Sequence, residues 1–123
     1  MAHHYRALET FAYNVETEEH RTGIAIVAYP LKVEPLQSFT VEVAVICMDK
    51  GCDLTGKRFF VSENGIDEDF KATLTWKAWN ARYMKWEYHG KVTCRAPENT
   101  GSYEWFTVFP YQSRHRRSMA RFP

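Results

Sequence analysis

Cysteine and histidine are the residues whose types and spacing could build a chemical site in this chain. Cys47 and Cys52 form a C-x4-C pair, and His89 and Cys94 form an H-x4-C pair. Together they offer four ligands of the kind that hold zinc in a tetrahedral site. However, Cys47 and Cys94 also fit core-facing positions of predicted strands, where a free cysteine acts as a small apolar side chain. We therefore predict no metal and no cofactor, and keep this zinc site and a Cys47–Cys94 disulfide as the alternatives.

Motifs for catalysis are absent from the sequence. It contains no G-x-S-x-G, no H-E-x-x-H and no P-loop. The acidic loop at residues 67–69 lacks the alternating ligands and the glycine of a calcium loop. We therefore predict that the protein is not an enzyme.

Residues 73–91 are the most informative segment for binding. This segment holds three of the four tryptophans, together with four Lys/Arg and a single acid, Glu87. Aromatic rings with interleaved cations can stack bases and contact phosphates of single-stranded nucleic acid. The same residue types dominate protein–protein hot spots. The segment therefore predicts a binding surface, provided that its rings lie outside the core.

The backbone conformation of this segment decides which rings are exposed. As a helix, it would bury Trp76, Trp79, Tyr83 and Trp86 in one stripe. As a hairpin that turns near Asn80, it would bury Trp76, Met84, Trp86 and Tyr88 and expose Lys77, Trp79, Arg82, Tyr83, Lys85 and His89. β-Branched and aromatic residues favour strands, so we predict the hairpin and keep one short helix near residues 68–89 as the alternative.

Charge is unevenly distributed along the chain. Residues 1–70 carry six Lys/Arg and twelve Asp/Glu, whereas residues 71–95 carry six Lys/Arg and one acid. Residues 111–123 carry four arginines and no acid.

We predict a β domain at residues 1–110 and a basic tail at residues 111–123. The predicted partner-binding residues are Lys77, Trp79, Arg82, Tyr83, Lys85, His89, Arg114, Arg116 and Arg117.

The elements that must position these residues are predicted to be strands. Period-two alternation of apolar residues is clearest at residues 37–48, and residues 11–15, 22–29, 57–63, 91–95 and 102–111 show similar patterns. Short strands separated by turn residues predict a mainly β fold, a single antiparallel sandwich or open barrel of about seven strands. Residues 102–111 are predicted to form an exposed edge through which two copies could pair.

A small binding protein is the function that these patterns favour. We predict an accessory or inhibitor protein that docks on a larger protein or nucleoprotein, with single-stranded nucleic-acid binding as the alternative. A compact chain without a family motif is also typical of proteins encoded by viruses or mobile elements. The sequence has no run of apolar residues that could span a membrane and no apparent export signal. We therefore expect no membrane partner and a cytoplasmic location.

Overall fold

Eight β-strands and no helix make up the described part of the chain. The computed structural model describes residues 19–123, so the predicted strand at residues 11–15 lies outside the described residues. The strands are β1 (Thr22–Ala28), β2 (Ser38–Cys47), β3 (Arg58–Ser62), β4 (Phe70–Thr73), β5 (Trp76–Asn80), β6 (Lys85–Arg95), β7 (Trp105–Phe109) and β8 (Ser118–Phe122).

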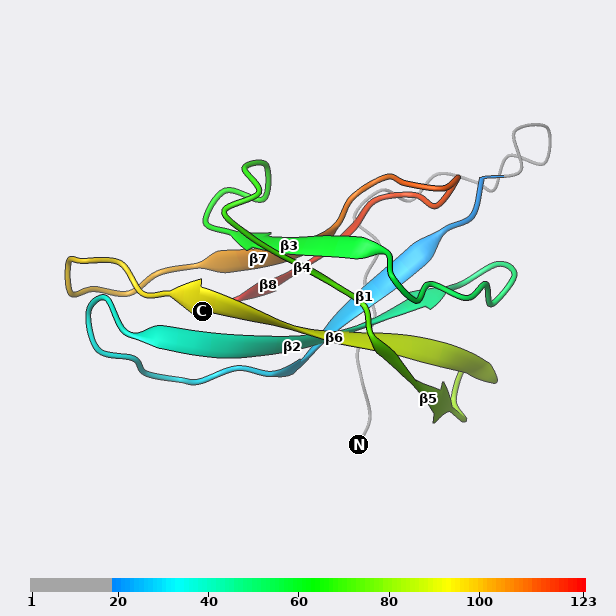
Figure 1. The fold of residues 1–123 in the computed structure, drawn as a ribbon, viewed down its shortest axis with the longest axis horizontal. Helices are drawn as coiled ribbons and strands as arrows, with labels where there is room; N and C mark the ends of the chain where they lie inside the picture. Colours follow the sequence, from blue (N-terminus) through cyan, green and yellow to red (C-terminus); the bar gives the residue numbers. More distant parts are fainter. Residues whose placement is uncertain (1–18) are drawn as a thin grey trace.

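The strands form two four-stranded antiparallel sheets that pack face to face (Figure 1). One sheet, which we call the lower sheet, has the order β1-β2-β6-β5, and the upper sheet has the order β4-β3-β7-β8. The two sheets do not close into a barrel. This arrangement confirms the predicted mainly β sandwich.

The core lies between the sheets and follows the alternation of the strands. In β2, the inward-facing Val41, Val43 and Val45 are completely buried. They meet Phe59 and Phe109 from the upper sheet in one apolar cluster. Because successive side chains of a strand point to opposite faces, the period-two pattern of residues 38–47 was sufficient to predict this strand and its inner face.

Residues 68–89 contain strands rather than a helix, which confirms the predicted hairpin. The segment is not one continuous strand before its turn, because β4 belongs to the upper sheet and β5 to the lower sheet. The chain crosses between the sheets at Leu74 and Thr75. Leu74 donates its backbone N–H to Lys57, and Thr75 donates its N–H to His89.

Two predictions about the C-terminal region are wrong. Residues 118–122 form β8, which pairs with β7, so the sandwich includes this part of the predicted tail. Ser118, Ala120 and Phe122 alternate as buried residues, and this short pattern is hidden among arginines in the sequence. The predicted edge at residues 102–111 is also wrong, because β7 lies between β3 and β8.

No helix in residues 19–123 is long and apolar enough to cross a membrane.

Candidate binding surface and candidate metal centre

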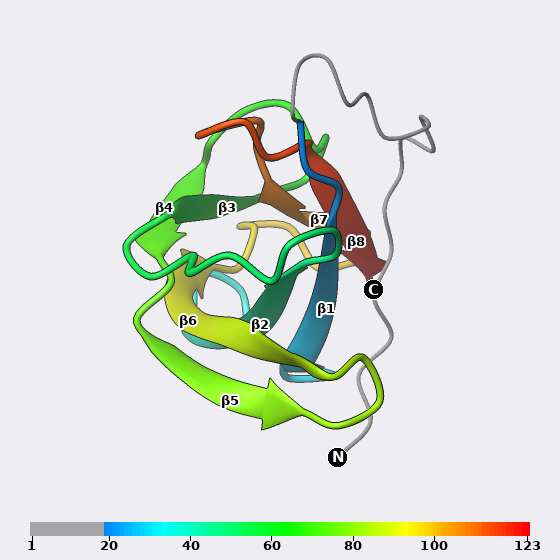
Figure 2. The same ribbon diagram turned by 90° about the vertical axis from the view of Figure 1, so that its right-hand side faces the viewer.

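The β5–β6 hairpin forms one edge of the lower sheet, with β5 outermost (Figure 2). Asn80 accepts the backbone N–H of Tyr83 and thereby closes the turn, and Met84 adopts a left-handed conformation with φ of 55°. This turn places Trp79 directly opposite Trp86. Their rings form an edge contact with centroids 5.3 Å apart.

Cations accompany these rings. Lys77 Nζ lies 4.5 Å from the centroid of the Trp86 ring, and the Arg82 guanidinium lies 5.6 Å from that of Tyr83. Both are cation–π contacts. We call this group the hairpin surface, and it consists of Lys77, Trp79, Arg82, Tyr83 and Trp86.

Two tryptophans and one methionine that were predicted to lie in the core are exposed instead. Trp76 and Trp86 are each 40% exposed and Met84 is 70% exposed, whereas Tyr88 is buried as predicted. The reason is that β5 packs mainly against β6 and makes little contact with the opposing sheet. The crossing at Leu74 also interrupts the alternation that would have carried the core face from β4 into β5.

His89, predicted to be exposed, is buried on the outer face of the lower sheet. Its Nδ1 lies 3.1 Å from Glu42 Oε2 and its Nε2 lies 2.9 Å from Glu87 Oε1. Trp76 stacks on the imidazole ring with centroids 5.4 Å apart. Because both ring nitrogens face carboxylate oxygens and the ring is covered, His89 holds strands together and does not form part of the hairpin surface.

The three predicted arginines lie near the start of β8, away from the edge formed by β5. Arg116 contacts the Glu19 carboxylate at 3.4 Å, and Arg117 donates a hydrogen bond to the Gly65 carbonyl oxygen at 2.7 Å. Arg114 accepts the backbone N–H of His20. The structure therefore does not gather the predicted binding residues into one patch.

Four side chains that bind metals in other proteins meet at one end of the sandwich. We call them the Cys/His cluster, and they are His20, Cys47, Cys52 and His115. Their ligand atoms all lie within 4.8 Å of one another. Cys47 and His115 are buried, and His20 and Cys52 are half-buried.

Backbone pairing positions the two histidines beside each other. His20 donates its N–H to the Arg114 carbonyl oxygen and accepts the N–H of Arg116, so it pairs with both neighbours of His115. Ser113 and Arg114 adopt left-handed conformations with φ of 48° and 60°. Two consecutive non-glycine residues rarely adopt this conformation without support from the surrounding structure. The strained loop directly precedes a member of the cluster.

The two cysteines are brought to the cluster by the end of β2 and the loop that follows it. Arg21 anchors this loop through Asp49, with its Nη2 2.6 Å from Asp49 Oδ1 and its backbone N–H donating to Asp49 Oδ2 at 2.6 Å. Gly51, with φ of 63°, donates its N–H to the Cys47 carbonyl oxygen and turns the chain back toward Cys52. The loop therefore holds both sulfur atoms on the side of His20.

The surroundings of the cluster give its two thiols different pKa values. Burial acts to raise the pKa of Cys47, but hydrogen bonds from His115 and from the backbone N–H groups of Cys52 and Lys50 outweigh it and lower the pKa to about 6. Burial raises the pKa of Cys52 to about 11, and the hydrogen bond to Cys47 and the charge on Cys47 act in the same direction. One thiolate is thus stabilised next to a neutral thiol.

The metal-ligand set considered from the sequence is only half correct. Cys47 and Cys52 do meet, but His89 lies between carboxylates and Cys94 lies in the core. All three cysteines are free thiols, so the alternative Cys47–Cys94 disulfide is not formed. The C-x4-C spacing was the one feature of the sequence that pointed to this cluster. The spacing of His20 and His115 could not indicate it, because they are 95 positions apart.

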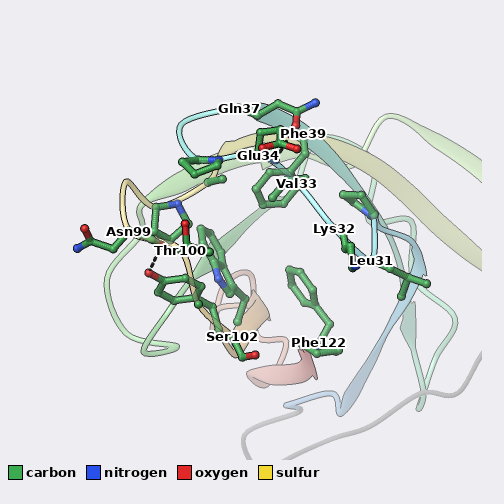
Figure 3. Close-up of a pocket in the computed structure, with 18 residues that line it drawn as sticks. Leu31, Lys32, Val33, Glu34, Gln37, Phe39, Asn99, Thr100, Ser102 and Phe122 are labelled. Carbon is green, nitrogen blue, oxygen red and sulfur yellow. Dashed lines mark hydrogen bonds between the residues drawn. The ribbon is translucent and has the colours of Figure 1, made fainter.

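A groove lies at the opposite end of the sandwich (Figure 3). It has a volume of about 580 Å³ and lies between the loop after β1, the loop after β6 and the end of β8. Phe39, Tyr103, Trp105 and Phe122 line it together with four prolines. Tyr103 is held by a hydrogen bond to the Asn99 carbonyl oxygen at 2.6 Å. The lining combines these rings and prolines with polar loop residues, and it brings no cluster of titratable groups together.

Comparisons with protein-family models, curated proteins and solved structures found no match to this chain.

Proposed function

We propose that this protein is a small non-catalytic binding protein that docks on an acidic segment of a larger protein through its hairpin surface. The observation that carries the proposal is the Trp79–Trp86 pair, whose residues are 49% and 40% exposed, with Lys77 over the Trp86 ring. Half-exposed tryptophans next to cations match the composition of protein–protein hot spots.

Charge supports an acidic partner. Lys77, Arg82, Lys85 and Lys91 all belong to this hairpin, whereas its single acid, Glu87, is buried and bonded to His89 and Asn80. The acid therefore does not cancel the positive charge at the surface. A partner segment that carries Asp or Glu beside apolar side chains would match both the charge and the rings.

The placement of the arginines favours a protein partner over single-stranded nucleic acid. The nucleic-acid alternative required these arginines to extend the aromatic surface as a basic tail. Instead, Arg116 contacts Glu19 and Arg117 is bonded to the Gly65 carbonyl group. Fewer cations then remain beside the rings to follow a phosphate backbone.

The proposal is tested with labelled peptides in which Asp and Glu flank Phe or Leu. The comparison probes are the same peptides with Asn and Gln in place of the acids, and labelled oligo(dT). We expect fluorescence anisotropy to detect saturable binding of the acidic peptides, and Trp79→Ala and Trp86→Ala to weaken it by about 30-fold each.

Leu31→Ala is the matched control, because Leu31 is 85% exposed and lines the groove at the opposite end. It should leave the affinity unchanged. Equal binding of the acidic and the amide peptides would contradict the proposal. Tighter binding of oligo(dT) with a steep salt dependence would replace it with the nucleic-acid alternative.

A further inference from the structure

Three of the six ligand-atom separations in the Cys/His cluster match those of a tetrahedral zinc site, and all six are within 4.8 Å. Zinc–sulfur bonds of about 2.3 Å and zinc–nitrogen bonds of about 2.0 Å put the ligand atoms of a tetrahedron about 3.3–3.8 Å apart. His20 Nδ1 lies 3.4 Å from His115 Nε2, 3.4 Å from Cys52 Sγ and 3.7 Å from Cys47 Sγ. These three separations all fall within the tetrahedral range.

Three polar atoms converge on one nitrogen of His20. Its Nδ1 directs either one proton or one lone pair at them, so a single hydrogen bond cannot engage all three. His115 donates its Nδ1–H to the Ser113 carbonyl oxygen at 2.8 Å. With that proton on Nδ1, the Nε2 lone pair is available to a metal ion, whose binding would replace the hydrogen bond between His115 and Cys47. An outer hydrogen bond of this kind typically orients a metal-binding histidine.

We propose that the Cys/His cluster binds one structural Zn²⁺ ion. Two thiolates and two imidazoles complete a four-coordinate site with no open position, which is the pattern of structural rather than catalytic zinc. Binding releases any proton still held by the two thiols, because the ligands are the thiolates. The proposal is independent of the docking function, since it involves none of the hairpin surface residues.

The ion would join the two sheets at one end of the sandwich. His20 lies two residues before β1, and Cys47 ends β2, so these two ligands are on the side of the lower sheet. His115 lies in the loop before β8 of the upper sheet. The site would also fix the loop between β2 and β3 through Cys52.

The first test is the metal content of the full chain, expressed with zinc and dialysed against a weak chelator. We expect one zinc per chain by plasma mass spectrometry. Cys52→Ser and His115→Gln should each lower the zinc affinity more than about 100-fold, since even outer-shell changes cost 10–100-fold. Cys94→Ala is the cysteine control, and His3→Ala with His4→Ala excludes binding by the N-terminal histidines. The controls should retain the ion.

The second test uses only wild-type protein, so it does not depend on whether the variants fold. Wild-type protein stripped with a strong chelator should melt at a lower temperature and recover when zinc is restored. Co²⁺ added to it should give the intense visible bands of tetrahedral cobalt and a thiolate charge-transfer band, both removed by zinc. The proposal would be overturned if the wild-type protein were purified without zinc and its melting temperature did not rise on adding zinc. Octahedral cobalt, or a Cys47–Cys52 disulfide under reducing purification, would overturn it as well.

Discussion

The three cysteines of this chain have three different environments, although the sequence presents them alike. Cys47 and Cys52 meet two histidines, with a pKa lowered to about 6 for the first and raised to about 11 for the second. Cys94 is packed in the core, where burial raises its pKa to about 12. Position in the fold, and not local sequence, therefore determines which thiols can bind or react.

Cys94 should make the stability of the protein depend on pH in alkaline solution. Its pKa is higher in the folded protein than the usual value of 9.0, so the folded state keeps this proton longer than the unfolded chain. The contribution is complete below pH 9 and is lost as the pH rises toward about 12. Urea unfolding should therefore show that the advantage of wild type over Cys94→Ala shrinks above pH 9. An advantage independent of pH would contradict this assignment.

Half of the Cys/His cluster could be recognised from the sequence. The C-x4-C pair draws attention to Cys47 and Cys52 because paired ligands often come from one short loop. The histidines could not be assigned, because His20 and His115 become neighbours only when the start of β1 pairs with the loop before β8. His89 was a plausible but wrong choice, since its spacing to Cys94 resembles a ligand pair by chance.

At the scale of elements, the alternation of apolar and polar residues predicted where the strands are better than it predicted which of their faces are buried. Residues 38–47 form one strand with the expected inner face, because β2 stays in one sheet throughout. Residues 70–80 also alternate, but they are divided between two sheets at Leu74. Period-two alternation contains no information about such a crossing, so the exposure of Trp76 and Trp86 could not be derived from it.

Gly90 lies where β6 closely approaches Phe59 and Thr73 of the opposite sheet. A Cβ atom at this position would lie 2.6 Å from Phe59 Cε1 and 2.6 Å from the backbone oxygen of Thr73. Gly90→Ala should therefore lower the free energy of unfolding by about 3 kcal/mol, because neither the ring nor the backbone can move freely. Chemical denaturation followed by circular dichroism measures this change.

Gly101→Ala is the control for that prediction. Its Cβ would meet only a ring carbon of Tyr103 at 3.8 Å, an ordinary contact. The free energy of unfolding should change by less than about 0.5 kcal/mol. If both substitutions changed the free energy of unfolding equally, the close contacts of Gly90 with Phe59 and Thr73 would be contradicted.

At the scale of the whole molecule, three features are distributed over the two ends of the sandwich. The Cys/His cluster and the turn of the β5–β6 hairpin lie at the end where β2 finishes, because Cys47 and Tyr88 are close in register. The aromatic groove lies at the other end. The mainly β architecture was predictable from strand patterns. The inclusion of residues 118–122 was not, since β8 is short and rich in arginine around its start.

The central claim is that one zinc ion joins the two sheets through the Cys/His cluster. X-ray absorption at the zinc edge of the purified full chain tests it most directly, because the scattering identifies the ligand atoms and their distances. We predict two sulfur ligands at about 2.3 Å and two nitrogen ligands at about 2.0 Å. A shell of oxygen ligands, or a single sulfur, would contradict the claim even if zinc were present in the sample.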